Sequence, residues 1–179
     1  AAVSEMAHSY NLPVEASAGG ADPHVPGIQV GYESALNYTL PVLSEPDLLV
    51  GPGSLGGSTV FSAEQLVLDV EVIRRCKRLG RGIEAAEGKW LEEVIRRAGP
   101  GGTYMAQAST RDALRAGEIH LSRLGVHDSY ERWQAGGKPD ILEQAREQIA
   151  QVLAAHPPLP LDETRLRALE QLERRARRS

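Results

Sequence analysis

Two short apolar segments, each followed by a polar loop and then by an amphipathic segment, dominate the first half of the chain. Residues 12–15 and 47–50 are short enough to be buried strands, and each runs into a loop rich in glycine and proline. The amphipathic segment 28–43 follows the first loop and carries apolar side chains at helical spacing, namely Tyr32, Ala35, Leu36, Leu40 and Leu43. This order of strand, loop and helix predicts an α/β fold with parallel strands.

A second helix is predicted to begin at Ser62. The residues Ser62 to Gln65 have the pattern of a capping box, in which the serine hydroxyl accepts a backbone N–H and the glutamine side chain reaches back to the cap. The helix has apolar residues on two sides and ends at Gly80, so we expect neighbours on both sides. It contains the sole cysteine, Cys76, which we interpret as a buried packing residue.

Beyond residue 80 the pattern predicts mainly helices. We expect a helix over 87–98 with inward Trp90, Leu91, Val94 and Ile95, a strand over 103–107, a capped turn at Ser109 and Asp112, a helix over 141–155, a proline-rich break over 157–160, and a last helix from Asp162. These elements predict two parts, a main domain over residues 1–138 and a helical extension over residues 139–179.

Composition narrows the classes of function. The chain has 179 residues, 41% of them hydrophobic and 25% charged, with a net charge of −4. That charge argues against a nucleic-acid partner, and no apolar run approaches the ~20 residues that cross a bilayer. The first residues lack the pattern of a signal peptide, and a lone cysteine forms no internal disulfide. We therefore expect a cytoplasmic protein.

The loops over 19–27 and 51–59 are the expected location of the site, because loops at the carboxyl ends of parallel strands build active sites in α/β proteins. The loop over 51–59 is rich in glycine, and two interpretations stay open. Its amides can cradle a phosphate, or its glycines can serve a tight turn that needs positive φ angles. It lacks the Lys-Ser/Thr ending of a phosphate-binding Walker loop.

The first loop contains the string Asp22-x-His24-x-x-Gly27. In corrinoid-binding domains this string provides an axial imidazole for cobalt, with the aspartate orienting the histidine. The Ser-x-Leu spacing of that signature is absent downstream, and two prolines stiffen the loop. The histidines show no metal-binding spacing with one another, and we expect no metal site.

The helix after the first loop carries a file of polar residues, Gln29, Glu33 and Asn37, spaced by four positions. One interpretation is a solvated helix face. In the other, Gln29 lies in the first turn and points into the mouth of the site, with Glu33 one turn deeper and Asn37 deeper again.

At these residues the chain resembles the carboxyl-terminal part of the trimethylamine methyltransferase family. The resemblance covers essentially the whole chain. It rests on the order and spacing of several motifs: 22–33, 53–55, 62–72, 99–102, 109–111, Trp133 with Gly136, and 159–162. Members of that family pass a methyl group from a methylated amine to a corrinoid carried on a separate protein, and the resemblance implies this activity.

The resemblance implies the carboxyl-terminal βα units of a TIM (β/α)8 barrel plus trailing helices. A closed barrel takes ~250 residues, so we expect the amino-terminal strands to be missing and the piece alone to be inactive. The implied partners are that amino-terminal portion, the corrinoid protein, the methylated amine, and further copies of the chain in a homo-oligomer. No cofactor is expected to bind directly; the corrinoid (cobalamin) is presented by the partner protein.

The resemblance also implies roles for the loop residues. Asp22 and Glu33 are the expected catalytic residues, as anionic contacts to a cationic substrate. The expected substrate-binding residues are His24, Gln29, Asn37 and Ser54. The chain contains only standard residues, so if the pyrrolysine position of the family falls within it, it resembles the branch without pyrrolysine, which uses quaternary amines such as betaines. Two alternatives stay open: a corrinoid-binding module that uses His24, and a non-catalytic α/β scaffold.

Overall fold

The computed structural model describes residues 1–157 and 160–177. It divides into two compact units, Ala1–Ile149 and Ala150–Ser179, and the division falls within helix α7 (Ile141–Ala155). The predicted organisation into residues 1–138 and 139–179 stays a prediction. Part of the predicted break over 157–160 lies outside the described residues. No helix in the described part of the chain combines the length and the apolar character needed to cross a membrane.

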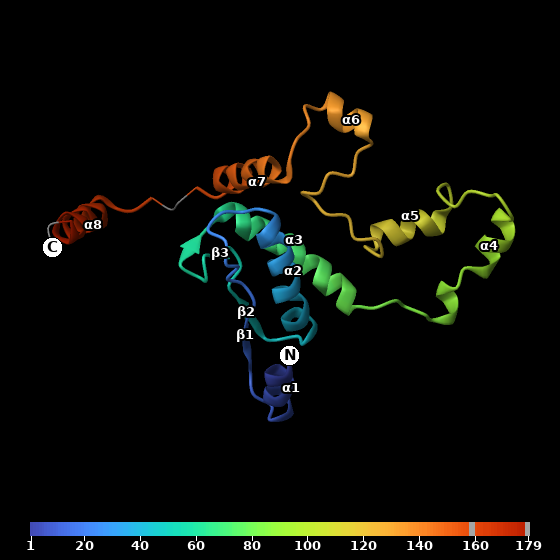
Figure 1. Cartoon of the computed structure of the whole chain (residues 1–179), viewed down its shortest axis with the longest axis horizontal. Helices are drawn as coiled ribbons and strands as arrows, with labels where there is room; N and C mark the ends of the chain where they lie inside the picture. The colour runs from blue at the N-terminus through green and yellow to red at the C-terminus, as the bar shows by residue number, and fades with distance from the viewer. Residues whose placement is uncertain (158–159, 178–179) are drawn as a thin grey trace. The chain divides into compact units, whose positions relative to one another are not determined.

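The first unit is built on a strand–helix–strand element (Figure 1). Strand β1 (Glu15–Ser17) pairs in parallel with β2 (Leu48–Val50), and helix α2 (Ile28–Leu43) connects them. The parallel pairing of the two strands and the bounds of the helix are confirmed, and the second strand begins one residue later than predicted. The first strand was predicted too early: it begins after Pro13, and the Val14 N–H is taken by the Asp47 carboxylate at 2.8 Å.

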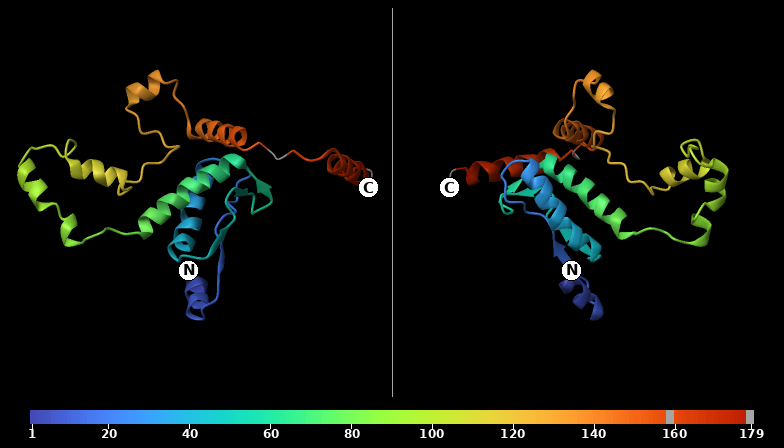
Figure 2. Two further views of the ribbon diagram at one scale, coloured as in Figure 1. Left: turned by 180° about the vertical axis from the view of Figure 1, so that it is seen from behind. Right: turned by 45° about the vertical axis from the view of Figure 1, so that its right-hand side comes forward.

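Helix α3 (Ala63–Gly80) packs along α2, and Figure 2 shows the two helices side by side in both views. Tyr38, Val42, Ala18 and Cys76 form the buried cluster between them, flanked by the half-buried Leu49, Val72 and Ile73. Cys76 is therefore a buried packing residue, as predicted. A second cluster of Ala21, Val30 and Leu55 lies under the loops.

The apolar positions noted along α2 are not the ones that the structure buries. The buried side chains are Val30, Ser34, Tyr38 and Val42, whereas the predicted apolar stripe is exposed, with Leu36 72% and Leu40 64% accessible. The inward face carries a tyrosine whose hydroxyl donates to the buried Asp69 carboxylate of α3. That polar contact orients the helix, and a count of apolar positions along the chain does not detect it.

The start of α3 confirms one half of the predicted capping box. The Ser62 hydroxyl accepts the Gln65 N–H at 3.1 Å, which satisfies one free donor of the first turn. The other half is wrong. The Gln65 side chain turns inward and donates to Asp69 at 2.7 Å, and the Ser62 hydroxyl donates to Glu64 at 3.1 Å.

The glycine-rich loop contains a small antiparallel hairpin that the sequence did not predict. Strand β3 (Ser54–Leu55) pairs with β4 (Val60–Phe61), and Leu55 also forms a parallel bridge with Ala21 of the first loop. The remaining elements are α1 (Ala2–Ser9), η1 (Glu87–Lys89), α4 (Glu92–Ala98), α5 (Ala108–Arg115), α6 (Tyr130–Ala135), α7 and, in the second unit, α8 (Glu163–Ala176). The last helix begins one residue after its predicted start, Asp162, whose carboxylate caps it by accepting the Arg165 N–H.

Three predictions between residues 81 and 115 are wrong. The helix over 87–98 is interrupted at Leu91, whose φ of 54° is incompatible with helix, and Trp90 is 59% exposed rather than inward. Residues 103–107 form turns rather than a strand, since no described strand lies beside them to pair with. Ser109 lies inside α5 rather than at its cap, which is Gln107.

Candidate functional site

The two loops meet at the carboxyl ends of β1 and β2, as predicted. The Ala18 N–H donates to the Val50 carbonyl at 3.0 Å, so the strands stay paired as they leave the sheet. Farther along, the Gly56 N–H donates to the Pro23 carbonyl at 2.9 Å and the Gly57 N–H to the Ala21 carbonyl at 3.2 Å. The loops over 19–27 and 51–59 therefore form one continuous surface.

Glycine is required where the two chains cross. A Cβ on Gly19 would overlap the Gly51 carbonyl oxygen, and a Cβ on Gly51 would lie 2.7 Å from the Gly19 nitrogen. Gly51 also has a φ of 106°, a region that favours glycine. These two residues fix how closely the loops approach each other.

The amides of the glycine-rich loop are used within the chain. Besides Gly56 and Gly57, the Gly53 N–H donates to Asp69, the Ser54 N–H to the Gly51 carbonyl and the Thr59 N–H to the Leu55 carbonyl. A phosphate cradle needs free amides pointing to one anion. The structure therefore favours the turn interpretation of this loop over the phosphate interpretation.

The buried carboxylate of Asp69 holds the glycine-rich loop in place. Asp69 is 1% exposed and accepts three hydrogen bonds. One of its oxygens accepts from the Tyr38 hydroxyl at 3.0 Å and from the Gly53 N–H at 2.8 Å, and the other accepts from Gln65 at 2.7 Å. Burial, together with the charge and hydrogen bond of Asp69, raises the pKa of Tyr38 well above its ordinary value. The phenol therefore stays protonated and donates to the carboxylate.

Sequence analysis missed this group of Tyr38, Gln65 and Asp69 as part of the site. The available signal was an aspartate in the middle of a helix between two apolar residues, Leu68 and Val70. A carboxylate in that position is expected to need a buried partner.

Three of the predicted residues form one hydrogen-bonded group. One oxygen of Glu33 accepts the Asp22 backbone N–H at 2.8 Å, and the other accepts the Gln29 side-chain amide at 2.7 Å. Gly27, the residue before α2, provides no side-chain cap, so Glu33 is what ties the first loop to the helix. The Asp22 carboxylate is exposed and has no hydrogen-bond partner among the described residues.

The other predicted residues lie at increasing distances from this group. The ring of exposed His24 rests against Gly56, because a Cβ there would lie 3.1 Å from the ring carbon Cδ2. Half-buried Ser54 is in β3, next to the residue that bridges to the first loop. Asn37 is exposed one turn beyond Glu33, and its side chain has no hydrogen bond among the described residues. The structure thus joins His24 and Ser54 to the loop surface and leaves Asn37 apart from it.

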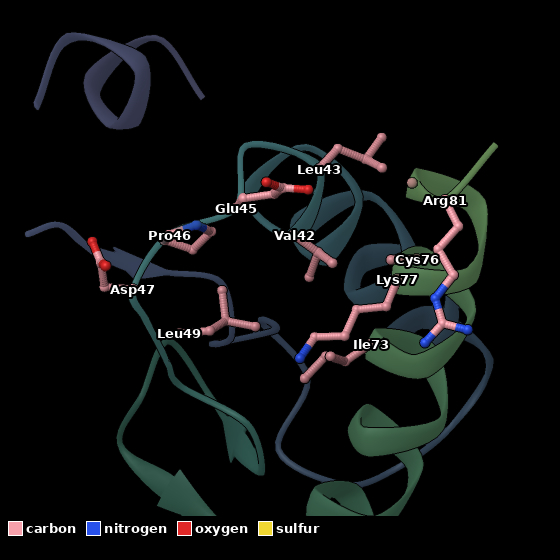
Figure 3. A pocket seen from close by; sticks show the side chains of 11 residues that line it. Val42, Leu43, Glu45, Pro46, Asp47, Leu49, Ile73, Cys76, Lys77 and Arg81 are labelled. Carbon is pink, nitrogen blue, oxygen red and sulfur yellow. The ribbon is translucent and has the colours of Figure 1, made fainter. Parts of the chain in front are cut away.

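Two cavities lie elsewhere in the first unit. Figure 3 shows a pocket of about 620 Å³ at the start of β2, between Val42, Leu49 and Ile73, with Glu45 at its rim. It is at the end of β2 opposite the loops. A more apolar groove of about 650 Å³ runs between α2 and α3 on their outer side. Within the described residues, no cluster of histidine, cysteine and acidic side chains has the composition of a metal site.

Comparison with known proteins settles the family. The model of the trimethylamine methyltransferase family matches residues 1–179. The chain belongs to this family. The resemblance seen in its sequence motifs is therefore confirmed.

Among the similar proteins, the trimethylamine methyltransferase MttB of Methanosarcina barkeri (strain Fusaro) is 32% identical over 164 residues, which are 90% of this chain and 32% of that protein. The trimethylamine methyltransferase MttB of Desulfitobacterium hafniense (strain DCB-2) is 29% identical over 91% of this chain and 32% of its own length. The glycine betaine methyltransferase of Desulfitobacterium hafniense (strain Y51) is 26% identical, over 90% of this chain and 33% of its own length. The chain spans about a third of the length of these relatives.

Proposed function

We propose that this chain is part of an enzyme that moves a methyl group from a methylated amine, a quaternary one by preference, to the Co(I) corrinoid of a partner protein. Family membership is the observation that carries the proposal. The joined loop surface over 19–27 and 51–59 supports it, because it presents an exposed carboxylate and an imidazole at the carboxyl ends of parallel strands.

The protein itself need not provide the nucleophile for this reaction. The corrinoid of the partner provides the Co(I) nucleophile that accepts the methyl group, while the C–N bond breaks and its electron pair stays on nitrogen. A quaternary amine is already activated, since it leaves as a neutral amine. The protein has to hold the cation in line for displacement and keep its charge solvated by polar groups.

We assign the contact with the cationic nitrogen to Asp22, whose carboxylate is exposed and unengaged within the described residues. Glu33 already accepts two hydrogen bonds, so its role is to hold Asp22 and Gln29 in place. If the substrate carries a carboxylate, as betaines do, the His24 ring and the free N–H of Gln29 are positioned to donate to it.

The corrinoid is assigned to the partner protein because of the surroundings of His24. An axial imidazole needs an orienting partner, and within the described residues the Asp22 carboxylate makes no hydrogen bond to His24. The same ring is also packed against Gly56 of the second loop. These contacts suit a substrate-facing residue better than a ligand of cobalt.

We further propose that the strand–helix–strand element belongs to a TIM (β/α)8 barrel. Strands β1 and β2 are parallel neighbours joined through α2, which is the repeating arrangement of that fold. Each of the two strands keeps one edge unpaired among the described strands, and such edges pair with further strands or with another copy. In a barrel, the exposed apolar stripe of α2 would face neighbouring helices.

Trimethylamine is the second candidate substrate. Relatives named for trimethylamine are 28–32% identical to this chain, against 26% for the relative named for glycine betaine. The resemblance to the branch without pyrrolysine favours the quaternary amine instead.

The test is to follow Co(I) methylation by absorbance with the protein at its full natural length and its corrinoid partner protein. A panel of betaines and methylamines is compared for the unmodified protein, Asp22→Asn and, as a matched control outside the loop surface, Asn37→Ala. We expect turnover of a betaine, a loss of about tenfold or more in Asp22→Asn, and little change in Asn37→Ala. Turnover of trimethylamine alone would reject the quaternary substrate, and an unchanged Asp22→Asn would reject the assigned contact.

A further inference from the structure

A basic cavity lies at the carboxyl-terminal half of α3, far along the helix from the loops at its start. It has a volume of about 430 Å³ and is bounded by α3 and by the segment 114–123 that returns to it. Its charged lining is dominated by Arg74, Arg78, Arg81, Arg123 and His120, and we call it the α3 basic pocket. Nothing in the proposed methyl transfer uses these residues.

Hydrogen bonds fix the returning segment against the helix. The Arg78 guanidinium donates to the carbonyls of Gly117 and Glu118 at 3.1 and 3.0 Å and pairs with the Glu118 carboxylate at 2.6 Å. The Arg123 backbone N–H donates to the buried Glu71 carboxylate at 3.0 Å. The walls of the pocket therefore come from two segments about forty to fifty residues apart that are held together.

Positive charge exceeds negative charge in the pocket. Arg74 is paired with Glu71 at 2.7 Å and Arg78 with Glu118. The side chains of Arg81 and Arg123 have no ion pair within the described residues. Lys77 and Arg81 line both this cavity and the neighbouring pocket of Figure 3. Of the two, only the Lys77 side chain is directed toward Leu49 in that figure, so we leave out Lys77.

His120 lies beside the pocket and can report on its occupation. Its ring lines the same cavity, while its Nε2 atom is covered by protein and has no hydrogen-bond partner in the described part of the chain. An anion held by the neighbouring guanidinium groups would therefore lie next to the ring without accepting a hydrogen bond from Nε2.

We propose that the α3 basic pocket binds the phosphate group of a small anion. The guanidinium groups of Arg81 and Arg123 are permanently charged and have the planar fork that matches phosphate oxygens. The dipole of α3 accounts for cations in its last turn, but not for Arg123 and His120, which come from another segment. The volume accommodates free phosphate or the phosphate end of a small ester.

Calorimetry and NMR of the whole chain at constant ionic strength test the proposal. The probes are inorganic phosphate and glycerol phosphate, with chloride as the reference anion. We expect saturable binding of at least one phosphate probe and a shift of the His120 ring nitrogen resonance. Tighter binding of inorganic phosphate would identify the free anion as the ligand, and tighter binding of glycerol phosphate would identify an ester.

Variants separate this site from general charge attraction. Arg81→Gln with Arg123→Gln should weaken binding about tenfold or more, while Arg75→Gln, which lies on the same helix outside the pocket, should leave it unchanged. Arg81→Gln alone serves if the double variant does not fold. Absence of saturable binding, an unshifted His120 ring, or an equal loss in Arg75→Gln would overturn the proposal. None of these results depends on methyl transfer.

Discussion

Asp69 and Glu33 both hold the loop surface, and they do so in opposite surroundings. Asp69 is 1% exposed and accepts hydrogen bonds from Tyr38, Gln65 and the backbone of Gly53, which belong to three different parts of the fold. Water cannot reach this carboxylate to replace a lost partner. The glycine-rich loop therefore depends on it for its position.

Glu33 lies at the surface, where its two hydrogen bonds come from Asp22 and Gln29 nearby in the chain. Water can take over either bond when it is lost, so each contributes little to stability. The two carboxylates therefore have different roles. The buried Asp69 stabilises the fold beneath the loops, whereas Glu33 at the surface positions Asp22 and Gln29, which face a ligand. Changes beneath the loops should cost stability, and changes above them should alter binding.

The largest expected effect is that of Asp69→Ala. The change leaves the Tyr38 hydroxyl, the Gly53 N–H and the Gln65 amide buried without an acceptor. We expect it to lower the free energy of unfolding by about 3 kcal/mol or more, measured by urea denaturation. The matched variant at the surface, Glu33→Ala, should cost about 1 kcal/mol. Equal losses of stability in the two variants would contradict the claim that Asp69 stabilises the fold more than Glu33 does.

The crossing of the loops gives the next effect. Gly51→Ala places a methyl group against the Gly19 backbone at a φ of 106° and should cost about 1–3 kcal/mol of unfolding free energy. Gly57→Ala is the matched control, since its φ is 61° and a Cβ there meets nothing within 4 Å. It should cost about 1 kcal/mol. A larger loss in Gly57→Ala would show that the close crossing is not what constrains the loops.

The pH dependence of stability in Tyr38→Phe tests the buried contact between Tyr38 and Asp69. The raised pKa of Tyr38 means that the unfolded chain releases this proton above about pH 10 while the folded chain retains it. The stability that Tyr38 contributes is therefore present below pH 10 and is lost as the pH rises above it.

The Phe variant should lose about 0.5–1.5 kcal/mol at neutral pH and decline less steeply above pH 10 in denaturation experiments. Identical slopes for the two proteins would contradict the assigned contact between Tyr38 and Asp69.

Glu33→Gln should have the smallest effect on stability, below about 1 kcal/mol. Its expected effect is local, because the Asp22 N–H then faces a neutral acceptor in place of a carboxylate. We expect faster hydrogen exchange at Asp22 with no change at Gly53, which Asp69 holds. Faster exchange at both residues would show that the two sides of the loop surface are coupled.

Elements determined by local signals were predicted well from the sequence. Helix α2 was predicted over its whole length, Ser62 was identified as a helix cap, and the last helix was predicted to within one residue of its start, because these signals lie within a few neighbouring residues. Elements that depend on a distant partner were not. The strand predicted over 103–107 has no neighbouring strand among the described residues, and the hairpin β3–β4 forms in a loop whose glycines gave no apolar pattern.

The candidate site divides in the same way. Asp22, Gln29 and Glu33 lie within one stretch of twelve residues that follows a strand, so the strand–loop–helix order already placed them together. The contact of Tyr38 with Asp69 joins residues 31 positions apart on two helices. Tyr38 lies on the buried face of α2, while the apolar stripe of that helix is exposed within the described residues and would face neighbouring helices in the proposed barrel.

The most direct test of the central claim is an NMR titration of the isotopically labelled chain with glycine betaine and, separately, with trimethylammonium. If the methylated amine binds to the surface formed by both loops, we expect concentration-dependent shifts at Asp22, His24 and Gly56 together, reduced in Asp22→Asn and unchanged in Asn37→Ala. Shifts that avoid one of the two loops, or none for either amine, would contradict binding at this surface.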